Sequence, residues 1–223
     1  MFILGLTGSI GMGKSTAAKM LRRLGVPIHD SDAVVHRLMS RGGAAVPAIA
    51  HHYPDAVRDG AVDRGALSRI AFHDPGVLKT LEAILHPLVR QSQTRFLARA
   101  AARRAPVVVL DIPLLFETGA ERRCDAVIVV TAPPMIQWAR VMARPGMTAD
   151  KLRAILKRQM PDREKRRRAD FIVDTGLGRR HSLRELARIV TLVSSRRGRH
   201  WPPRPPLSSC YSNRQRNRLP RHA

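Results

Sequence analysis

The sequence predicts an α/β protein with a doubly wound, five-stranded parallel sheet covered by helices. Short β-branched runs alternate with helical patterns along the chain, as in consecutive βαβ units. A run such as Val107–Leu110 is apolar on both faces, which is typical of a parallel strand packed between helices. The length of 223 residues, with 44% hydrophobic and 26% charged residues, indicates one ordinary globular domain.

The expected elements follow from these patterns in chain order. Strands are expected at residues 2–7, 26–29, 107–110, 126–131 and 171–173. Helical periodicity indicates helices at about residues 14–24, 32–39, 76–103, 135–143, 149–158 and 182–193. Residues 33–105 hold no strong strand although they separate two sheet strands, so we expect them to form a helical insertion.

The formal net charge of +23 is partly concentrated at the C-terminal end of the chain. Residues 196–223 contain eight arginines and no acidic residue or lysine, and they have no apolar periodicity. We therefore expect a folded body of residues 1–195 and a disordered Arg/Pro-rich tail over 196–223. The body remains basic without the tail, which indicates either phosphate-rich partners or a solvated arginine face.

Cysteine content and hydropathy exclude several classes of protein. Cys124 and Cys210 provide neither a disulfide framework nor a set of metal ligands. No apolar run approaches the roughly 18 residues that span a bilayer, and the N-terminus has no secretory signal pattern. We expect a cytoplasmic protein with no membrane partner.

A phosphate-binding loop follows the first predicted strand. Gly8–Ser15 fits the pattern G-x-x-x-x-G-K-[ST] between a strand and a helix, which is the context that this motif requires. Glycines let successive N–H groups point at phosphate oxygens, and the helix N-terminus adds partial positive charge. Lys14 would reach the β- and γ-phosphates, and the Ser15 hydroxyl would bind Mg²⁺. The motif predicts binding of a nucleoside triphosphate.

Two further predicted strands end in carboxylates, which would face the ligand crevice of a parallel sheet. Asp30 and Asp32 follow the strand at 26–29, where one would act on an attacking hydroxyl while Asp30 or Ser31 caps the next helix. Asp111 ends the strand at 107–110, as in the Walker-B arrangement that holds Mg²⁺ directly or through water.

Arg140 and Arg144 stand four residues apart and therefore share one face of a predicted helix. Two guanidinium groups on one face can bind the transferring phosphoryl group. In a chain this rich in arginine, a solvated helix face is the alternative interpretation.

These motifs together resemble the dephospho-coenzyme A kinase family. The pieces that carry the resemblance are Gly5–Ser15, Gly25–Pro27 leading to Asp30–Asp32, Leu85-His86-Pro87, Asp111–Glu117, Arg140 with Arg144, Arg158-Gln159-Met160-Pro161, and Ala169-Asp170. Their order and spacing cover residues 2 to about 193. A phosphate loop alone is common to many NTPases, whereas this combination is far more specific. Asp174 departs from the pattern, because Asn is frequent there.

The resemblance implies a P-loop kinase fold and ATP-dependent phosphorylation of the ribose 3′-hydroxyl of dephospho-coenzyme A, the last step of coenzyme A biosynthesis. It implies a core at about 1–32, 106–134 and 161–195, a helical acceptor-binding insertion at about 33–105, and a lid at about 135–160. ATP and Mg²⁺ would be the cofactors.

The resemblance also assigns residues to roles. Lys14, Asp32 and Arg140 would be catalytic, with Asp32 as the base. ATP would be bound by Gly8, Gly11, Met12, Gly13, Lys14, Ser15, Thr16, Arg140 and Arg144. The acceptor would be bound by Asp32, His86, Leu114, Leu115 and Glu117. Mg²⁺ would be bound by Ser15 and Asp111.

Two other functions fit part of the pattern. A nucleoside monophosphate or shikimate-type kinase would share the loop and the lid arginines, but we would not expect it to carry Leu85-His86-Pro87 together with Pro113-Leu114-Leu115. An NTP-dependent nucleic-acid-binding protein would explain the charge, but the 4% aromatic content and the lack of helicase-like motifs disfavour it. We therefore expect ATP and dephospho-coenzyme A as partners and no specific nucleic acid. The pattern indicates no particular oligomeric state.

Overall fold

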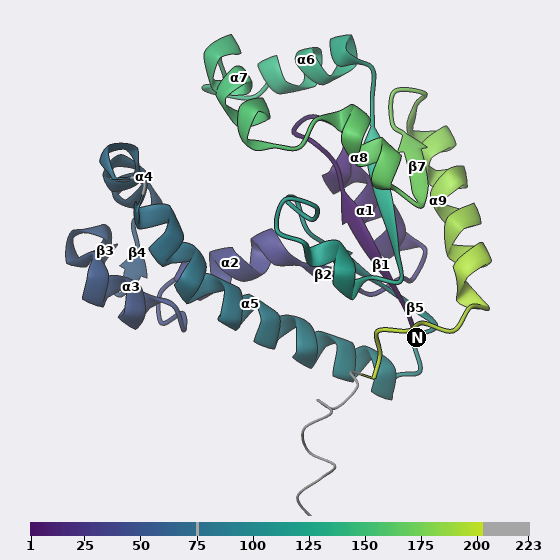
Figure 1. Cartoon of the computed structure of the whole chain (residues 1–223), viewed down its shortest axis with the longest axis horizontal. Helices are drawn as coiled ribbons and strands as arrows, with labels where there is room; N and C mark the ends of the chain where they lie inside the picture. The colour runs from purple at the N-terminus through teal and green to yellow at the C-terminus, as the bar shows by residue number, and fades with distance from the viewer. Residues whose placement is uncertain (75, 203–223) are drawn as a thin grey trace, which may run out of the picture.

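The computed structural model describes residues 1–74 and 76–202, and a five-stranded parallel sheet forms its core (Figure 1). The strands are β1 Phe2–Thr7, β2 Ile28–Asp30, β5 Val107–Asp111, β6 Ala126–Thr131 and β7 Phe171–Asp174. Their order is β2-β5-β1-β6-β7, so β1 is central and pairs with β5 and β6. The predicted fold class and its five strands are confirmed.

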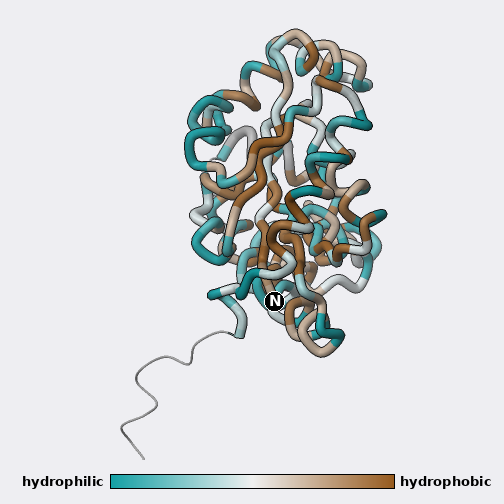
Figure 2. Tube along the Cα trace, turned by 90° about the vertical axis from the view of Figure 1, so that its right-hand side faces the viewer, coloured by the Kyte–Doolittle hydropathy of each residue, from teal (hydrophilic) through white to brown (hydrophobic). Residues whose placement is uncertain are grey.

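Helices cover both faces of this sheet. Successive side chains of each strand point to opposite faces, and because both sets are apolar, both faces must be buried. On one face, Leu4 and Ile128 pack against α1 (Lys14–Arg23) and α9 (Arg179–Ser194). On the other face, Ile3 and Val108 pack against the end of α5 (Gly76–Ala102) and the turn after β5, which includes η2 (Ala120–Arg123). Figure 2 shows the apolar strands running through the interior of the body.

The segment between β2 and β5 is mainly helical, as expected, and has an apolar cluster of its own (Figure 1). Its elements are α2 Ser31–Met39, α3 Val46–His52, η1 Pro54–Ala56, β3 Val57–Arg58, β4 Ala61–Val62, α4 Arg64–His73 and α5. The antiparallel pair β3–β4 was not predicted, because each strand has only two residues. α5 is 27 residues long and runs from this cluster back to the sheet.

Three helices connect β6 to β7. α6 Pro134–Met142 and α7 Ala149–Arg158 lie beyond the carboxyl edge of the sheet, and α8 Asp162–Arg168 lies beside β6 (Figure 1). The sequence predicts α6 and α7 but not α8, whose letters DREKRRR look like a solvated charge run. In the structure Lys165 of α8 is fully buried, and its Nζ lies 2.9 Å from Oε1 of Glu117. No helix in the described ranges is both long and apolar enough to cross a membrane.

The folded body extends beyond the predicted boundary at residue 195. The Arg199 N–H donates a hydrogen bond to Asp125, whose other carboxylate oxygen accepts from the Ile3 N–H. Trp201 packs on the apolar cluster beside the turn after β5. The prediction that disorder starts at 196 is therefore corrected for residues 196–202, and the remainder of the predicted tail, 203–223, lies outside the described residues.

A pair of truncations tests the role of residues 196–202. We expect a chain ending at Ser195 to unfold about 2–8 °C below one ending at Pro202, because the loss of partly buried Trp201 costs about 1–2 kcal/mol. Both chains should keep turnover within about twofold of the full chain near physiological salt, where distant charges are screened. Thermal melts and initial rates provide the two readouts. Equal melting temperatures would contradict the packing role.

Candidate active site

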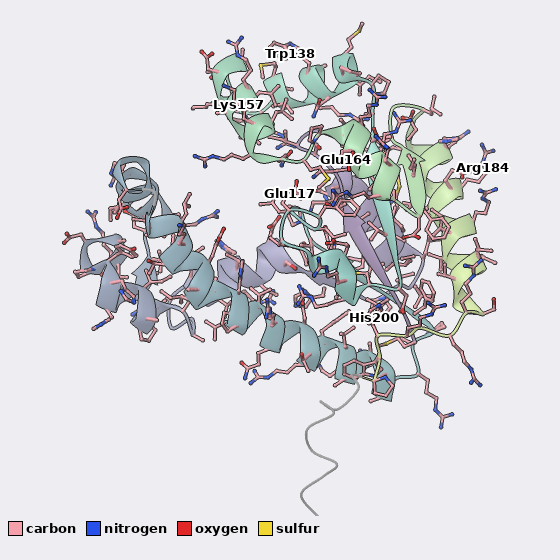
Figure 3. All side chains as sticks on the ribbon, in the orientation of Figure 1. Glu117, Trp138, Lys157, Glu164, Arg184 and His200 are labelled. Carbon is pink, nitrogen blue, oxygen red and sulfur yellow. The ribbon has the colours of Figure 1, made fainter. Side chains whose placement is uncertain are left out.

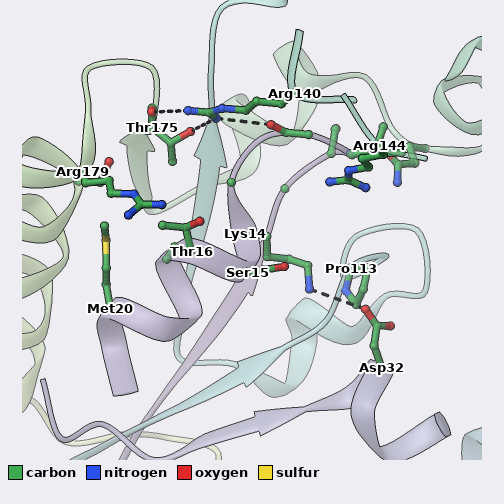
Figure 4. A pocket seen from close by; sticks show the side chains of 18 residues that line it. Lys14, Ser15, Thr16, Met20, Asp32, Pro113, Arg140, Arg144, Thr175 and Arg179 are labelled. Carbon is green, nitrogen blue, oxygen red and sulfur yellow. Dashed lines mark hydrogen bonds and ion pairs between the residues drawn. The ribbon is translucent and has the colours of Figure 1, made fainter. Parts of the chain in front are cut away.

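The phosphate loop connects β1 to α1 and lines a cavity of about 510 Å³ (Figure 4). Gly13 has φ 88°, and a Cβ there would lie 2.9 Å from Thr175 Oγ1, so both the backbone conformation and the space require glycine. The predicted nucleotide-binding residues on this cavity are Gly8, Gly11, Gly13, Lys14, Ser15, Thr16, Arg140 and Arg144. The loop is therefore folded as a cradle for phosphate groups.

Lys14 lies at the centre of the charged groups. Its Nζ is 3.9 Å from Asp32 Oδ2 (Figure 4). The same Nζ is 2.6 Å from Asp111 Oδ1, and the Lys14 side chain is 15% exposed. The side chain of Asp111 is only 3% exposed, and burial raises its pKa while Lys14 opposes the rise. A triphosphate that enters the cavity can therefore attract the Lys14 ammonium away from the Asp32 and Asp111 carboxylates beside it.

The two candidate carboxylates after β2 have different roles. Asp30 Oδ1 accepts a hydrogen bond from the Ala33 N–H and caps α2. The side chain of Asp32 lines the cavity instead, and partial desolvation raises its pKa, with Lys14 opposing the rise. A carboxylate with a raised pKa at the cavity wall is suited to proton transfer.

Arg140 of α6 is held at the cavity by the turn after β7. Its guanidinium donates to Thr175 Oγ1 and to the Thr175 carbonyl, each at 2.8 Å (Figure 4). The Thr175 hydroxyl also donates to the Met12 carbonyl at 2.9 Å. Arg140 is therefore pre-positioned beside the phosphate loop, with less conformational freedom to lose when phosphates bind.

Two glutamines at opposite ends of the predicted lid, residues 135–160, hold the backbone of one residue of the phosphate loop, Ile10. The Gln137 Nε2 of α6 donates to the Ile10 carbonyl at 2.7 Å. The Ile10 N–H donates to Oε1 of Gln159, directly after α7, at 3.1 Å. The position of the lid is thus coupled to the conformation of the loop.

Removal of this pair should lower activity more than stability. We expect Gln137→Met or Gln159→Met to reduce kcat/KM for ATP about 5- to 10-fold, since each loses one hydrogen bond worth about 1 kcal/mol. The double variant should lose less than the product of the single losses, because both side chains hold the backbone of the same residue, Ile10. Steady-state kinetics test this, with Gln91→Met on the exposed side of α5 as the matched control. Fully multiplicative losses would contradict the coupling.

A second cavity of about 400 Å³ lies between α5 and the loop after β5, next to Asp32. Its lining is mainly apolar and includes Leu85, Val89 and Ile112. His86 and Leu114, both predicted to bind the acceptor, line this cavity.

Three predicted site residues have other positions. Leu115 is fully buried in the apolar cluster beside the turn after β5 and does not line this second cavity. Glu117 lies next to α8 (Figure 3). Its carboxylate accepts a hydrogen bond from the Met160 N–H at 2.7 Å and contacts Lys165 of α8. The side chain of Met12 is 3% exposed and its Sδ accepts from the Ala132 N–H, so this side chain supports the loop from behind.

Several residues at the first cavity have no predicted role in the sequence. These are Gln159, Thr175 and Arg179, with Gln137 behind the loop. Gln159 belongs to Arg158-Gln159-Met160-Pro161, a motif with no assigned chemistry. Its position in that motif is the one signal that could have identified it.

Comparisons with known proteins show the family of this chain. The sequence profile of the dephospho-CoA kinase family matches residues 2–178. The chain belongs to the dephospho-CoA kinase family. A dephospho-CoA kinase of Paramagnetospirillum magneticum is 64% identical over 166 residues, covering 74% of this chain and 78% of that protein. A dephospho-CoA kinase of Mesorhizobium japonicum is 54% identical over 198 residues, covering 89% of this chain and all of that protein.

Solved structures show the same fold. A crystal structure from Thermus thermophilus has a TM-score of 0.76 at 40% identity, covering 86% of this chain and 96% of its own. The dephospho-CoA kinase of Campylobacter jejuni has a TM-score of 0.66 at 24% identity, with the same coverage.

Proposed function

We propose that this protein transfers the γ-phosphoryl group of ATP to the ribose 3′-hydroxyl of dephospho-coenzyme A. The observation that carries the proposal is that Asp32 lines both cavities, so a single carboxylate faces the phosphate loop on one side and the apolar pocket on the other. A hydroxyl bound in the second cavity would meet a phosphoryl group held in the first at this residue.

Each group would then act at a defined place. Asp32 accepts the proton of the attacking hydroxyl or orients it, which requires the ionised carboxylate. Lys14 and Arg140 bind phosphoryl oxygens, where charge increases in the transition state. The lid helices α6 and α7 exclude water, which would otherwise compete as acceptor.

The residues present also suit Mg²⁺. The described residues contain no cluster of three or more His, Cys, Asp or Glu side chains able to hold a metal by itself. Mg²⁺ in kinases is held mainly by substrate phosphates and water with one or two protein oxygens. Ser15 at the cavity and Asp111 behind Lys14 would supply those oxygens. When bound, the ion neutralises charge on the phosphates.

A direct assay tests the proposal. The full chain is incubated with ATP, Mg²⁺ and dephospho-coenzyme A. The products are then separated, and their masses are measured by mass spectrometry. The expected product is 3′-phosphorylated and forms in equal amount to ADP. Parallel reactions contain AMP or shikimate as acceptor. Phosphorylation of one of these acceptors, with none of dephospho-coenzyme A, would refute the proposal.

A further inference from the structure

Two arginines from different elements meet at the second cavity. Arg90 is on α5 and Arg123 is the last residue of η2, and both line this otherwise mainly apolar pocket. Neither guanidinium forms an ion pair with any carboxylate of residues 1–74 and 76–202, although Asp32 and Glu82 line the same pocket. Two neighbouring cations without a counter-ion among these described residues indicate a place for an anion from outside.

Arg123 is fixed in place by a buried residue. Its Nη1 donates to Oε1 of Gln93, at 3.0 Å, and Gln93 is only 5% exposed. Gln93 lies one helical turn after Arg90 on α5, so the two share a face of that helix. The amide therefore holds the guanidinium of η2 against the helix that carries the second guanidinium.

The two arginines repel each other in the absence of a ligand. Partial burial and the charge of Arg90 both lower the pKa of Arg123, in that order of importance. A phosphate group between them would remove the repulsion and accept hydrogen bonds from both planar forks. Neither arginine lines the first cavity, so the phosphates of ATP are not its natural occupant.

We infer that Arg90 and Arg123 bind the diphosphate bridge of the acceptor nucleotide, an inference that rests on the proposed function. In dephospho-coenzyme A the diphosphate is attached to the 5′ carbon of the ribose whose 3′-hydroxyl reacts. When that hydroxyl is at Asp32, the diphosphate must lie within the length of one sugar from it, in the cavity that Asp32 shares with the two arginines. The apolar lining that remains suits the neutral arm beyond the diphosphate.

Binding and kinetics of charge-neutral variants test this inference. Arg90→Gln and Arg123→Gln should each raise KM and the calorimetric Kd for dephospho-coenzyme A about 10- to 100-fold, because each removes charge-assisted hydrogen bonds. KM for ATP should stay within about twofold. Arg123→Lys, which keeps the charge but loses the fork, should fall between the wild type and Arg123→Gln. The control is Arg122→Gln, an exposed arginine next to Arg123 that does not line the pocket.

The outcomes separate this inference from the proposed function. If the wild type forms no product from dephospho-coenzyme A, the proposed function fails. If the wild type is active but both Gln variants keep its acceptor KM within twofold, only the arginine site is refuted. An equal rise of KM in Arg122→Gln would also refute it, because the effect would then come from general surface charge. Thermal melts of each variant confirm that it is folded.

Discussion

Lys14→Ala is expected to lower kcat/KM by about 100- to 1,000-fold. One well-placed donor to the charge that develops in the transition state contributes about 2.7–4 kcal/mol. The Lys14 ammonium is the side-chain cation nearest to Asp32 and Asp111, at 3.9 and 2.6 Å. Initial rates with ATP and dephospho-coenzyme A measure the loss.

The control for this variant is on the same helix. Lys19→Ala changes an exposed lysine of α1 and should stay within about twofold of wild type. Thermal melts must accompany the rates, because removal of Lys14 leaves Asp111 buried without its cation, which destabilises the fold. A folded Lys14→Ala protein with turnover within tenfold of wild type would exclude Lys14 as the main phosphoryl-binding group.

Asp32→Asn should reduce kcat about 100-fold while the Kd for ATP changes little. An amide keeps the size of the side chain but cannot accept the proton of the hydroxyl, and a positioned base contributes about 10²- to 10⁴-fold. The lower end applies here because a loose phosphoryl-transfer transition state needs little help from a base. Rates and nucleotide titrations together measure the separation of the two effects.

Asp30→Asn is the matched control for Asp32→Asn. Asp30 caps α2, and Asn is also a good capping residue, so this variant should keep both its fold and most of its activity. If Asp30→Asn lost activity while Asp32→Asn kept it, the assignment of the base would be wrong.

The pH dependence adds a second readout for Asp32. The pKa of Asp32 is raised above its ordinary value, so the active, ionised form is lost as the pH falls through that raised pKa. The acid limb of kcat/KM, which reports ionisation of the free enzyme, should therefore lie at higher pH than an unperturbed Asp would give. In Asp32→Asn this limb should disappear, and any residual acid limb belongs to Asp111, whose pKa is also raised.

The strands and the phosphate loop were predictable because their signals are local. Short, mainly apolar runs defined β1, β5 and β6 within a residue. α8 was not predictable in this way, because a helix of seven residues depends on tertiary contacts. Its decisive contact is between Lys165 and Glu117, which are 48 positions apart in the sequence.

The candidate site likewise contains residues that local sequence signals predicted and residues that they did not. Lys14, Asp32 and Arg140, each named from a local motif, all line the first cavity. Leu115 and Glu117 belong to the same motif as Leu114, but the turn after β5 directs the three side chains to different surroundings. The arginine pair in the second cavity, Arg90 and Arg123, has no sequence signal, because these residues are among 40 basic ones.

The central position of β1 has a consequence for synthesis of the chain on the ribosome. β1 is the first element made, yet its neighbours β5 and β6 start at Val107 and Ala126, and Phe2 pairs with Val107. At a translation rate of about 5–20 residues per second, roughly 5–20 s pass between synthesis of β1 and synthesis of its first partner strand. During that interval the nascent chain presents an unpaired strand with Phe2, Ile3 and Leu4 exposed, a segment that chaperones would shield until the sheet can close around it.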